Sequence, residues 1–498
     1  MAGLAACAIL GGLIWLAIRS IYRLYFHPLS RFPGPKLAAI TSGYECYFNV
    51  VKKGSFVWEL ERLHEIYGPI IRITPREIHI KDSDYYDEIY AGAARKREKD
   101  GPAVRQFDVD GSVFAAISAE VHRERRASLN PSFSKQAISQ NETDIKKRLD
   151  QFYRHLSKAC QTGRTISLDA GFSALTTDII LHYVFGFESG NLEQEDFNEH
   201  IRDGIIQLFT SAHVAYFFPF VPAIMKSLPL ALVRVMNPFA VALTLQKDDL
   251  RQRVRKFLSG HHSENGCVME KLCSPAMPPH MLDVERLTDE GFTMAIAGTE
   301  TTARSLSLGA FHIYTNERVK NKLREELRTI MPTPESCPSW NELEQLPYLS
   351  GVVYEALRVS TGISTRSPRI APTETLVYND YQIPPGTLVS ETHFFVLNDP
   401  DIFPDPEVFE PERWMRATAK GEHLGRYLVN FSKGSRNCLG INLAYAELFM
   451  TIATLVRRFD LEIDESSKKQ LMFVRDFGNP YPDEGVLSLP VKVTASID

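Results

Sequence analysis

The sequence lacks paired cysteines, a positive net charge and a glycine-rich phosphate loop, and each absence excludes a class of function. Its 498 residues contain seven cysteines, an odd number without a CxxC pair, which argues against a disulfide framework and for a reducing compartment. A formal net charge of −5 provides no basic surface of the kind that nucleic acid requires, so no nucleic-acid partner is expected. Neither a Walker-type loop nor a GxGxxG after a strand occurs, so we expect no nucleotide site in the chain itself.

Five histidine and cysteine residues, which are zinc-type ligands, gather within 20 residues of the chain. The cluster comprises His261, His262, Cys267, Cys273 and His280, whose spacings fit no zinc template. Glycine and proline lie between these residues and are typical of a loop. We therefore expect a loop here and no zinc site.

The chain does have length and apolar content. Hydrophobic residues make up 44% of it and charged residues 23%, which is enough to bury a large core. At about 150 residues per domain, the length alone would predict three domains. The motifs that carry chemistry are spread over most of the chain but have to meet at one site, and this predicts a single large body instead.

The first 18 residues carry no charged side chain, and as a helix they would span about 27 Å, nearly a bilayer core. Basic residues follow this segment rather than precede it, at Arg19, Arg23, Arg31 and Lys36. This favours a retained anchor over a cleaved signal or a buried helix, and it places the body in the cytosol. We expect an anchor at residues 1–24, a hinge at 25–36 around Phe32-Pro33-Gly34-Pro35, and a globular domain at 37–498.

Apolar residues recur at a helical period through most of the body, which predicts a mostly α fold. The predicted helices are Ser55–Ile66, Ile138–Ala159, Leu282–Tyr314, Glu317–Ile330 and Asn341–Val359. Strand signals lie mainly in Arg369–Val396, where turns at Asn379-Asp380 and Pro384-Pro385-Gly386 predict a small hairpin-rich sheet. The aromatic stretch Val214–Pro222 interrupts the helices and predicts either a buried loop or a patch that dips into a membrane surface.

A lone cysteine, Cys438, lies in the compact loop Phe431–Gly440, between two glycines. An apolar helix pattern starts directly after it, from Leu439 through Leu455. The helix dipole and the unpaired N–H groups of a helix N-terminus stabilise a thiolate, so the site suits an anionic metal ligand. A buried structural cysteine is the alternative.

The string Phe431-Ser432-Lys433-Gly434-Ser435-Arg436-Asn437-Cys438-Leu439-Gly440 resembles the haem-ligand signature F-x-x-G-x-R-x-C-x-G of the cytochrome P-450 family at every fixed position. The resemblance implies a triangular, mostly α body with small β-sheets and a long central helix over the haem. It implies Cys438 as the axial ligand of haem b, with Phe431 and Arg436 at the cofactor.

A second match is Glu355-Ala356-Leu357-Arg358, an ExxR motif on a predicted helix. Alone it is weak, because exposed i, i+3 ion pairs are common. It precedes Pro411-Glu412-Arg413-Trp414, which resembles the family's PERW segment. The resemblance implies a buried triad of Glu355, Arg358 and Arg413 that supports the cysteine loop and has a structural rather than a catalytic role.

A third match is Ala297-Gly298-Thr299-Glu300-Thr301-Thr302, inside a predicted helix that Gly298 and the threonines weaken. A simple kink is one explanation. The string resembles the family's oxygen-binding segment, which implies that Thr301 contacts bound oxygen and Glu300 helps to deliver protons. Gly298 and Ala297 would leave space at the haem for oxygen and substrate.

Haem propionates need cationic partners, and the resemblance supplies candidates in separate segments. Arg436 and Arg369 match recurring propionate ligands. His122 and Arg126 lie at i and i+4 on a predicted helix and should face one way, although the family more often has Trp in place of His122, and Arg125 is an alternative to Arg126. These basic residues and Lys433 are equally consistent with a solvated face or a docking surface for an acidic reductase.

Together these motifs imply a haem-thiolate monooxygenase that hydroxylates or epoxidises an apolar small molecule with O₂. NADPH would supply electrons through a separate cytochrome P-450 reductase, with cytochrome b5 as a second donor, at the endoplasmic reticulum membrane. Tyr25–Leu29 and Gly440–Leu448 are similar to filamentous-fungal members, including the trichodiene-oxygenase-like group, which implies a terpenoid or polyketide substrate. A haem-thiolate isomerase, dehydratase or reductase, and a non-catalytic membrane-tethered binding protein, are the alternatives.

Five segments are expected to contact substrate, although core packing would give the same aromatic character. They are Gly101–Ala115, Phe209–Phe220, Phe292–Ala297, Thr361–Thr365 and Phe477–Tyr481.

Overall fold

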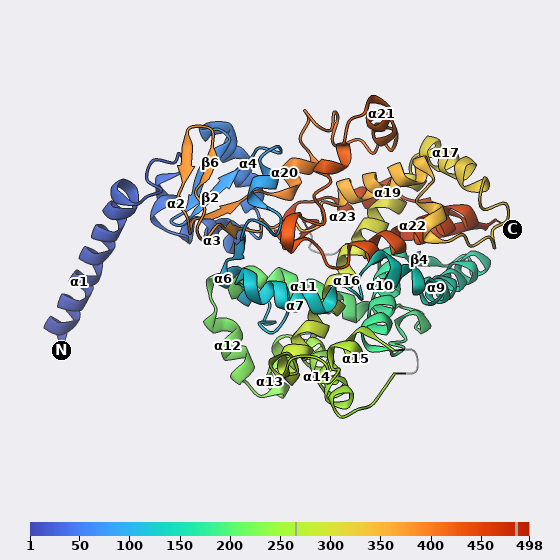
Figure 1. Ribbon diagram of the computed structural model, residues 1–498, viewed down its shortest axis with the longest axis horizontal. Coiled ribbons are helices and arrows are strands. Elements are labelled where there is room, and N and C mark those ends of the chain that lie inside the picture. The colour runs from blue at the N-terminus through green and yellow to red at the C-terminus, as the bar shows by residue number, and fades with distance from the viewer. Residues whose placement is uncertain (264–265, 484–486, 498) are drawn as a thin grey trace.

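The structure is a computed structural model that describes residues 1–263, 266–483 and 487–497. Helices dominate it and the sheets are small, so the predicted fold class is confirmed (Figure 1). The longer helices are α1 Ala2–Ile21, α4 Phe56–Tyr67, α7 Ala119–Leu129, α9 Glu142–Thr162, α10 Leu168–Phe185, α11 Glu199–Phe217, α12 Phe220–Ser227, α14 Pro238–Leu258, α16 Val284–Tyr314, α17 Glu317–Arg328, α19 Pro347–Ser360, α21 Glu412–Lys420 and α22 Ile441–Arg458. The shorter helices are α2 Lys36–Ile40, α3 Gly43–Cys46, α5 Tyr86–Ile89, α6 Gly101–Arg105, α8 Lys135–Gln140, α13 Leu230–Met236, α15 Val268–Leu272, α18 Trp340–Leu343, α20 His393–Leu397 and α23 Lys468–Leu471.

The strands form four small sheets. One sheet has the order β1-β2-β8-β5-β3 and another the order β4-β12-β9, while β6-β7 and β10-β11 are two-stranded. The strands are β1 Ile70–Thr74, β2 Glu77–Ile80, β3 Glu98–Lys99, β4 Thr165–Ser167, β5 Arg369–Ile370, β6 Leu376–Tyr378, β7 Tyr381–Ile383, β8 Leu388–Ser390, β9 Phe459–Ile463, β10 Arg475–Phe477, β11 Asn479–Tyr481 and β12 Pro490–Ser496. The hairpin predicted in Arg369–Val396 is therefore present as β6-β7.

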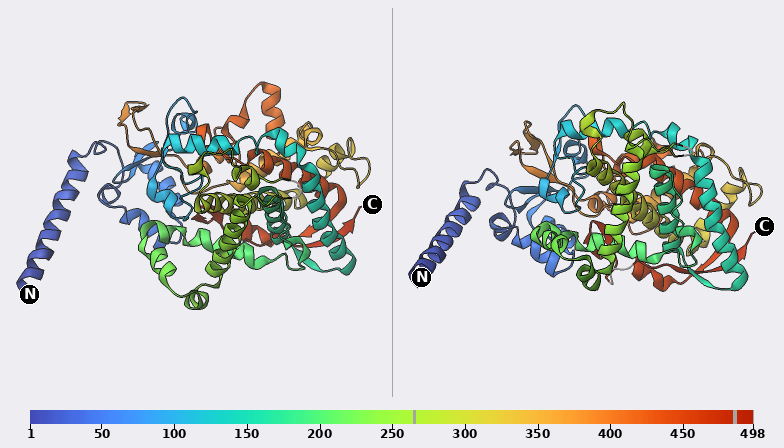
Figure 2. Two further views of the ribbon diagram at one scale, coloured as in Figure 1. Left: turned by 60° about the horizontal axis from the view of Figure 1, so that its bottom comes forward. Right: turned by 90° about the horizontal axis from the view of Figure 1, so that it is seen from below.

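The helix α16 is the centre of the body and packs against α10, α14, α19 and α22 (Figures 1 and 2). Its 31 residues span about 46 Å, and the Asp283 side chain caps its first turn by accepting a hydrogen bond from the Arg286 N–H at 2.8 Å. At Gly298 an added Cβ would lie 2.8 Å from the Ile180 side chain of α10. The glycine therefore lets these two helices approach closely.

The predicted helices at Ser55–Ile66, Leu282–Tyr314 and Glu317–Ile330 correspond to α4, α16 and α17. Ile138–Ala159 is instead divided between α8 and α9 at Asn141, and Asn341–Val359 between α18 and α19. In the second case the reason is Pro347, which occupies the first turn of α19 because it has no N–H to continue a preceding helix. Both predictions of one continuous helix were wrong.

The stretch Val214–Pro222 is not a buried loop. It contains the end of α11 and the start of α12, and no residue of α12 is buried. Phe220 and Ile224 are 59% and 54% exposed. The alternative of a membrane-surface patch stays a prediction.

The amino-terminal helix stands away from the body (Figures 1 and 2). Among the described residues, Gly3–Phe26 is the helix that is straight, long and apolar enough to cross a membrane, and none of it is buried. The following residues fold onto the body, where Phe32 is buried and stacks on Tyr381 with a centroid distance of 5.2 Å. The division of the chain into anchor, hinge and globular domain stays a prediction.

Candidate active site

The cysteine loop is held between α5 and the start of α22. The Cys438 N–H donates a hydrogen bond to the Phe431 carbonyl at 2.8 Å, which closes the loop. Gly434 has a φ of +71°, and a Cβ there would collide with the backbone oxygen of Ala91. Glycine is therefore required at this position, and the signature string has a structural cause.

The Cys438 side chain opens on a cavity but is otherwise surrounded by protein, and this burial raises the pKa of its thiol. The Gly440 N–H and the Arg126 guanidinium act in the opposite direction by favouring the thiolate. The helix α22 begins only three residues after Cys438, so the positive end of its dipole also favours the thiolate. These donors suit a thiolate that is paired with a metal ion.

The cavity has a volume of about 450 Å³ and extends from Cys438 to the β1-β2-β8 sheet. Its walls include apolar side chains from four of the five segments expected to contact substrate, among them Val104, Phe107, Phe209, Ile296 and Ile363. The fifth segment contributes Gly478 only. Phe477 and Tyr481 do not line the cavity but pack against Phe209, which does, together with Ile205 and Ile206.

The helix α16 borders the cavity with Ala297, Gly298 and Thr301. The Thr301 hydroxyl donates a hydrogen bond to the Ala297 carbonyl at 2.8 Å, one turn earlier. Since a Cβ on Gly298 would press on Ile180, helix packing explains this glycine, and its contact with the cofactor stays a prediction.

Glu300 is not part of the cavity wall. It is buried, and it forms no hydrogen bond or ion pair with any residue in the described part of the chain. Burial raises the pKa of Glu300 to about 7, and the opposing effects of Arg304 and Arg202 are smaller. The two predicted catalytic residues therefore lie on different faces of α16, and Glu300 titrates close to neutrality.

Four cationic side chains line the same cavity: Lys99, Arg126, Arg369 and Arg436. None forms an ion pair with a carboxylate among the described residues. Arg436 donates instead to the carbonyls of Arg97, Ala116 and Ile117 at 3.0, 2.5 and 2.7 Å. Burial, followed by mutual repulsion, lowers the pKa of Arg436 to about 10 and that of Lys99 well below its usual range.

Strand pairing brings two of these cations together and so favours the binding of an anion between them. Lys99 of β3 and Arg369 of β5 are direct cross-strand partners, a placement that is unfavourable for two like charges. An anionic group between them would remove the penalty. Haem b carries two propionates, so a cavity with a cysteine at one wall and four unpaired cations fits this cofactor.

His122 also lines the cavity, and burial with the nearby cations lowers its pKa to about 3. It is therefore a neutral hydrogen-bonding group. Arg126 lines the cavity and also donates to the Asn437 carbonyl of the cysteine loop at 2.7 Å. Arg125 donates to the carbonyls of Asp110 and Ser112 and is not part of the cavity wall. Sequence reasoning missed Lys99, because its neighbour Arg369 is distant in the chain.

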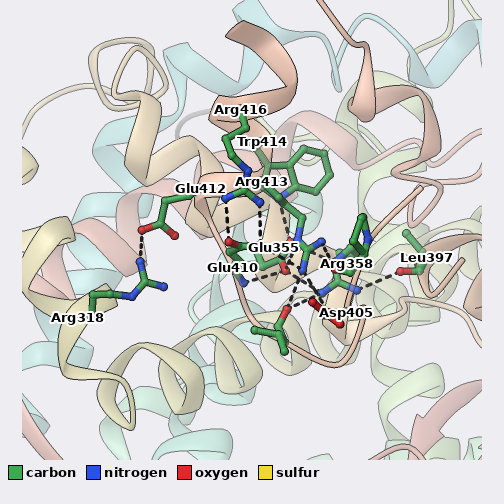
Figure 3. Close-up of polar contacts among 12 residues, drawn as sticks. Arg318, Glu355, Arg358, Leu397, Asp405, Glu410, Glu412, Arg413, Trp414 and Arg416 are labelled. Carbon is green, nitrogen blue, oxygen red and sulfur yellow. Dashed lines mark hydrogen bonds and ion pairs between the residues drawn. The ribbon is translucent and has the colours of Figure 1, made fainter. Parts of the chain in front are cut away.

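The predicted triad is present and fully buried (Figure 3). Glu355 Oε1 accepts hydrogen bonds from Arg358 at 2.7 Å and from Arg413 at 3.1 Å, and Oε2 accepts one from the Trp414 indole at 2.9 Å. The Asn430 amide donates to the Leu357 carbonyl at 2.6 Å, which joins the helix of the triad to the cysteine loop. That the triad supports the cysteine loop stays a prediction.

Fold and site together define a haem-thiolate oxidoreductase, and the comparisons agree. The cytochrome P-450 family model matches residues 41–484. Conidiogenone synthase PchP450 of Penicillium rubens is 44% identical over 479 residues, which cover 95% of this chain and 96% of the relative. The cytochrome P-450 monooxygenase aflU of Aspergillus parasiticus is 41% identical over 493 residues, covering 99% and 98%.

The cytochrome P-450 monooxygenase TRI4 of Trichoderma arundinaceum is 39% identical over 467 residues, covering 93% of this chain and 90% of the relative. A crystal structure of a cytochrome P-450 superposes with a TM-score of 0.71 over 88% of this chain and 94% of that chain, at 19% identity, and confirms the fold. The chain belongs to the cytochrome P-450 family. It is a monooxygenase with a cysteine-ligated haem, and the alternative of a non-catalytic binding protein falls away.

Proposed function

We propose that the chain hydroxylates or epoxidises an apolar small molecule of fungal secondary metabolism, of the terpenoid or polyketide type. The observation that carries this proposal is the largely apolar cavity that reaches Cys438. The name of the relative conidiogenone synthase PchP450 supports a role in building one particular product. The test is to compare metabolites of a host that supplies a reductase, with and without the chain. A compound that loses abundance while a product one oxygen heavier appears identifies the substrate.

In this proposal Cys438 would bind the iron of haem b, and Arg126, Arg369, Arg436 and Lys99 would hold the propionates. His122 would donate a further hydrogen bond to a propionate, and Phe431 would pack beside the cofactor. When bound, the haem activates O₂, and its thiolate ligand favours O–O cleavage. The protein contributes the largely apolar cavity, the orientation of substrate and the delivery of protons.

Thr301 and Glu300 have different roles in proton delivery and lie on two faces of α16. The Thr301 hydroxyl is at the cavity, where it can pass on a proton and accept another. Glu300 has a pKa of about 7, so it gains and loses a proton with little cost at cytosolic pH. We propose that Glu300 replenishes protons from behind the helix.

Replacing Thr301 with alanine should uncouple electron use from product formation. We expect haem content and NADPH consumption to stay near the wild-type values, while most of the product is lost and hydrogen peroxide rises, because a positioned proton transfer is worth about 10²- to 10⁴-fold in rate. Measuring NADPH, peroxide and product in one assay shows the split. Thr301→Ser, which retains the hydroxyl, is the matched control and should keep most of the coupling; normal coupling in Thr301→Ala would refute the role.

Arg126→Gln should weaken haem retention. Loss of one charged hydrogen bond to a propionate is worth about 1.5–3 kcal/mol, or roughly 10- to 150-fold in affinity. Transfer of haem to an excess of an apoprotein acceptor measures this. Arg125→Gln removes a neighbouring arginine that bonds loop carbonyls only, so its transfer rate should stay unchanged; equal rates in both variants would contradict the assignment.

We further propose that the chain is a single-pass protein of the endoplasmic reticulum membrane with its body in the cytosol. The exposed apolar span Gly3–Phe26 supports this, as do the exposed Phe220 and Ile224 of α12, which would touch membrane lipid. Electrons would come from NADPH through cytochrome P-450 reductase, with cytochrome b5 as a second donor. The docking face would lie around Arg123 of α7, which is exposed.

A further inference from the structure

The helix α11 presents two polar groups to the cavity, and both lie among apolar side chains of the same helix. Phe209, Ala212, His213 and Tyr216 all line it, and their i, i+3, i+4, i+7 spacing places them on one face of the helix. His213 and Tyr216 take no part in holding the haem or in delivering protons. They are candidates for recognising a polar group of the substrate.

The hydrogen bond of His213 determines which of its two ring nitrogens carries the proton. Nε2 lies 2.6 Å from the Asp476 carbonyl oxygen, which only accepts, so Nε2 must carry the proton. Burial lowers the pKa of His213, and the ring is therefore neutral. Its Nδ1 is then a lone-pair acceptor, and no residue in the described ranges donates to it. His213 is 6% exposed, so this free acceptor lies inside the protein at the cavity wall.

The part of the cavity wall near Tyr216 contains three carboxylates, and two arginines form ion pairs with them. Arg366 forms ion pairs with Glu45, at 2.7 Å, and with Glu77, at 2.8 Å. Asp100, a third carboxylate at this end, pairs with Arg76 at 2.7 Å.

Two oxygens at this end, Glu45 Oε2 and Asn49 Oδ1, have no hydrogen-bond partner among the described residues. Three carboxylates thus share two guanidinium groups, and further acceptors are unsatisfied. A substrate carboxylate would find repulsion here, whereas a hydroxyl would find acceptors.

We propose that His213 is a specificity-determining residue, whose Nδ1 accepts a hydrogen bond from a hydroxyl on the part of the substrate that points away from the haem. This deepens the proposed function and rests on it. The substrate class is an apolar skeleton that already carries a hydroxyl group and is not a carboxylate. A hydroxylation, or a cyclisation quenched by water, must therefore precede this enzyme in its reaction sequence.

The test uses the purified holoenzyme and three probes of one chain length: 1-dodecanol, its methyl ether and dodecanoate. The ether keeps an oxygen acceptor but has no donor. Titrations follow the high-spin absorbance change that occurs when a ligand displaces water from the haem. We expect dodecanol to bind about three- to tenfold more tightly than the ether, the size of one neutral hydrogen bond, and dodecanoate to bind most weakly.

His213→Phe should abolish the preference for dodecanol while the affinity for the ether changes less than about twofold. His213→Gln, which restores an acceptor and a donor, should recover part of the preference. Ser211→Ala, an exposed position on the same helix, is the matched control and should retain all of it. An unchanged reduced carbon monoxide spectrum in each variant shows that the haem site is intact.

Equal affinities of the wild-type enzyme for alcohol and ether would overturn the proposal, and this result does not depend on whether any variant folds. A preference that survives in His213→Phe would also overturn it, as would a low-spin change that places the alcohol oxygen on the iron. If neither dodecanol nor its ether perturbed the haem, the proposed apolar substrate class itself would fail, which is a separate outcome.

Discussion

Glu355→Gln should be among the most destabilising single substitutions in this protein. Glu355 has no solvent exposure and is the only carboxylate that bonds both Arg358 and Arg413 within the described ranges. Glutamine has the same shape but no charge, so the buried Arg358 would lose its carboxylate partner, and Arg413 would keep only Glu410, at 3.9 Å. Breaking a buried ion pair in this way costs about 3–5 kcal/mol, against a total stability of about 5–15 kcal/mol for a typical protein.

The consequence should reach the haem, because Asn430 joins the helix of Glu355 to the cysteine loop. We expect little haem-loaded protein on expression and a marked drop in the temperature at which the haem absorbance is lost. Arg416→Gln removes an arginine from the same region whose pair with Glu410, at 2.8 Å, is exposed (Figure 3). It should cost less than about 1 kcal/mol, and a comparable loss in both variants would contradict the role of the triad.

Cys438→Ala should remove the thiolate signature entirely. No other cysteine in the described part of the chain lines the cavity, and the six others are distributed over remote segments. The reduced carbon monoxide complex of the wild type should show the red-shifted Soret band of a thiolate-ligated haem. In the variant we expect either haem-free protein or a haem with an unshifted band, and no monooxygenase activity.

The control for Cys438→Ala is Cys337→Ala, which removes an exposed thiol far from the cavity. It should leave the spectrum and the activity unchanged. A wild-type-like spectrum in Cys438→Ala would mean that another group binds the iron, and the assignment of the cysteine loop would then be wrong.

Periodicity predicted the mostly helical fold, and motifs named residues that the structure brings to one cavity. The string around Cys438 could be recognised because a φ of +71° at Gly434 and a close backbone contact demand specific residues. The helix α10 was missed because 16 of its 18 residues are buried, polar ones such as Asp169 and Asp178 included, so it has no amphipathic period. The short strands β1 and β2 were missed for a similar reason, since all of their residues are buried.

Contacts between residues that are distant in the chain could not be predicted from local sequence patterns. Lys99 joins the cation cluster because β3 pairs with β5, and nothing near Lys99 in sequence indicates this. Glu300 was predicted beside Thr301 in the oxygen site, but adjacent helical residues point about 100° apart, so only Thr301 borders the cavity. The free acceptor Nδ1 of His213 could be recognised only from the hydrogen bond of Nε2 to Asp476, which lies 263 positions away in the chain.

The most direct test of the central claim is the source of the oxygen in the product. The purified chain, reconstituted with cytochrome P-450 reductase and NADPH, is incubated with its substrate under ¹⁸O₂ in ordinary water, and the product is weighed by mass spectrometry. A monooxygenase in which Cys438 binds the haem iron and Thr301 passes on protons predicts one ¹⁸O atom per product molecule. A product that is an isomer, a dehydrated or reduced form of the substrate, or that carries only oxygen from water, would contradict it.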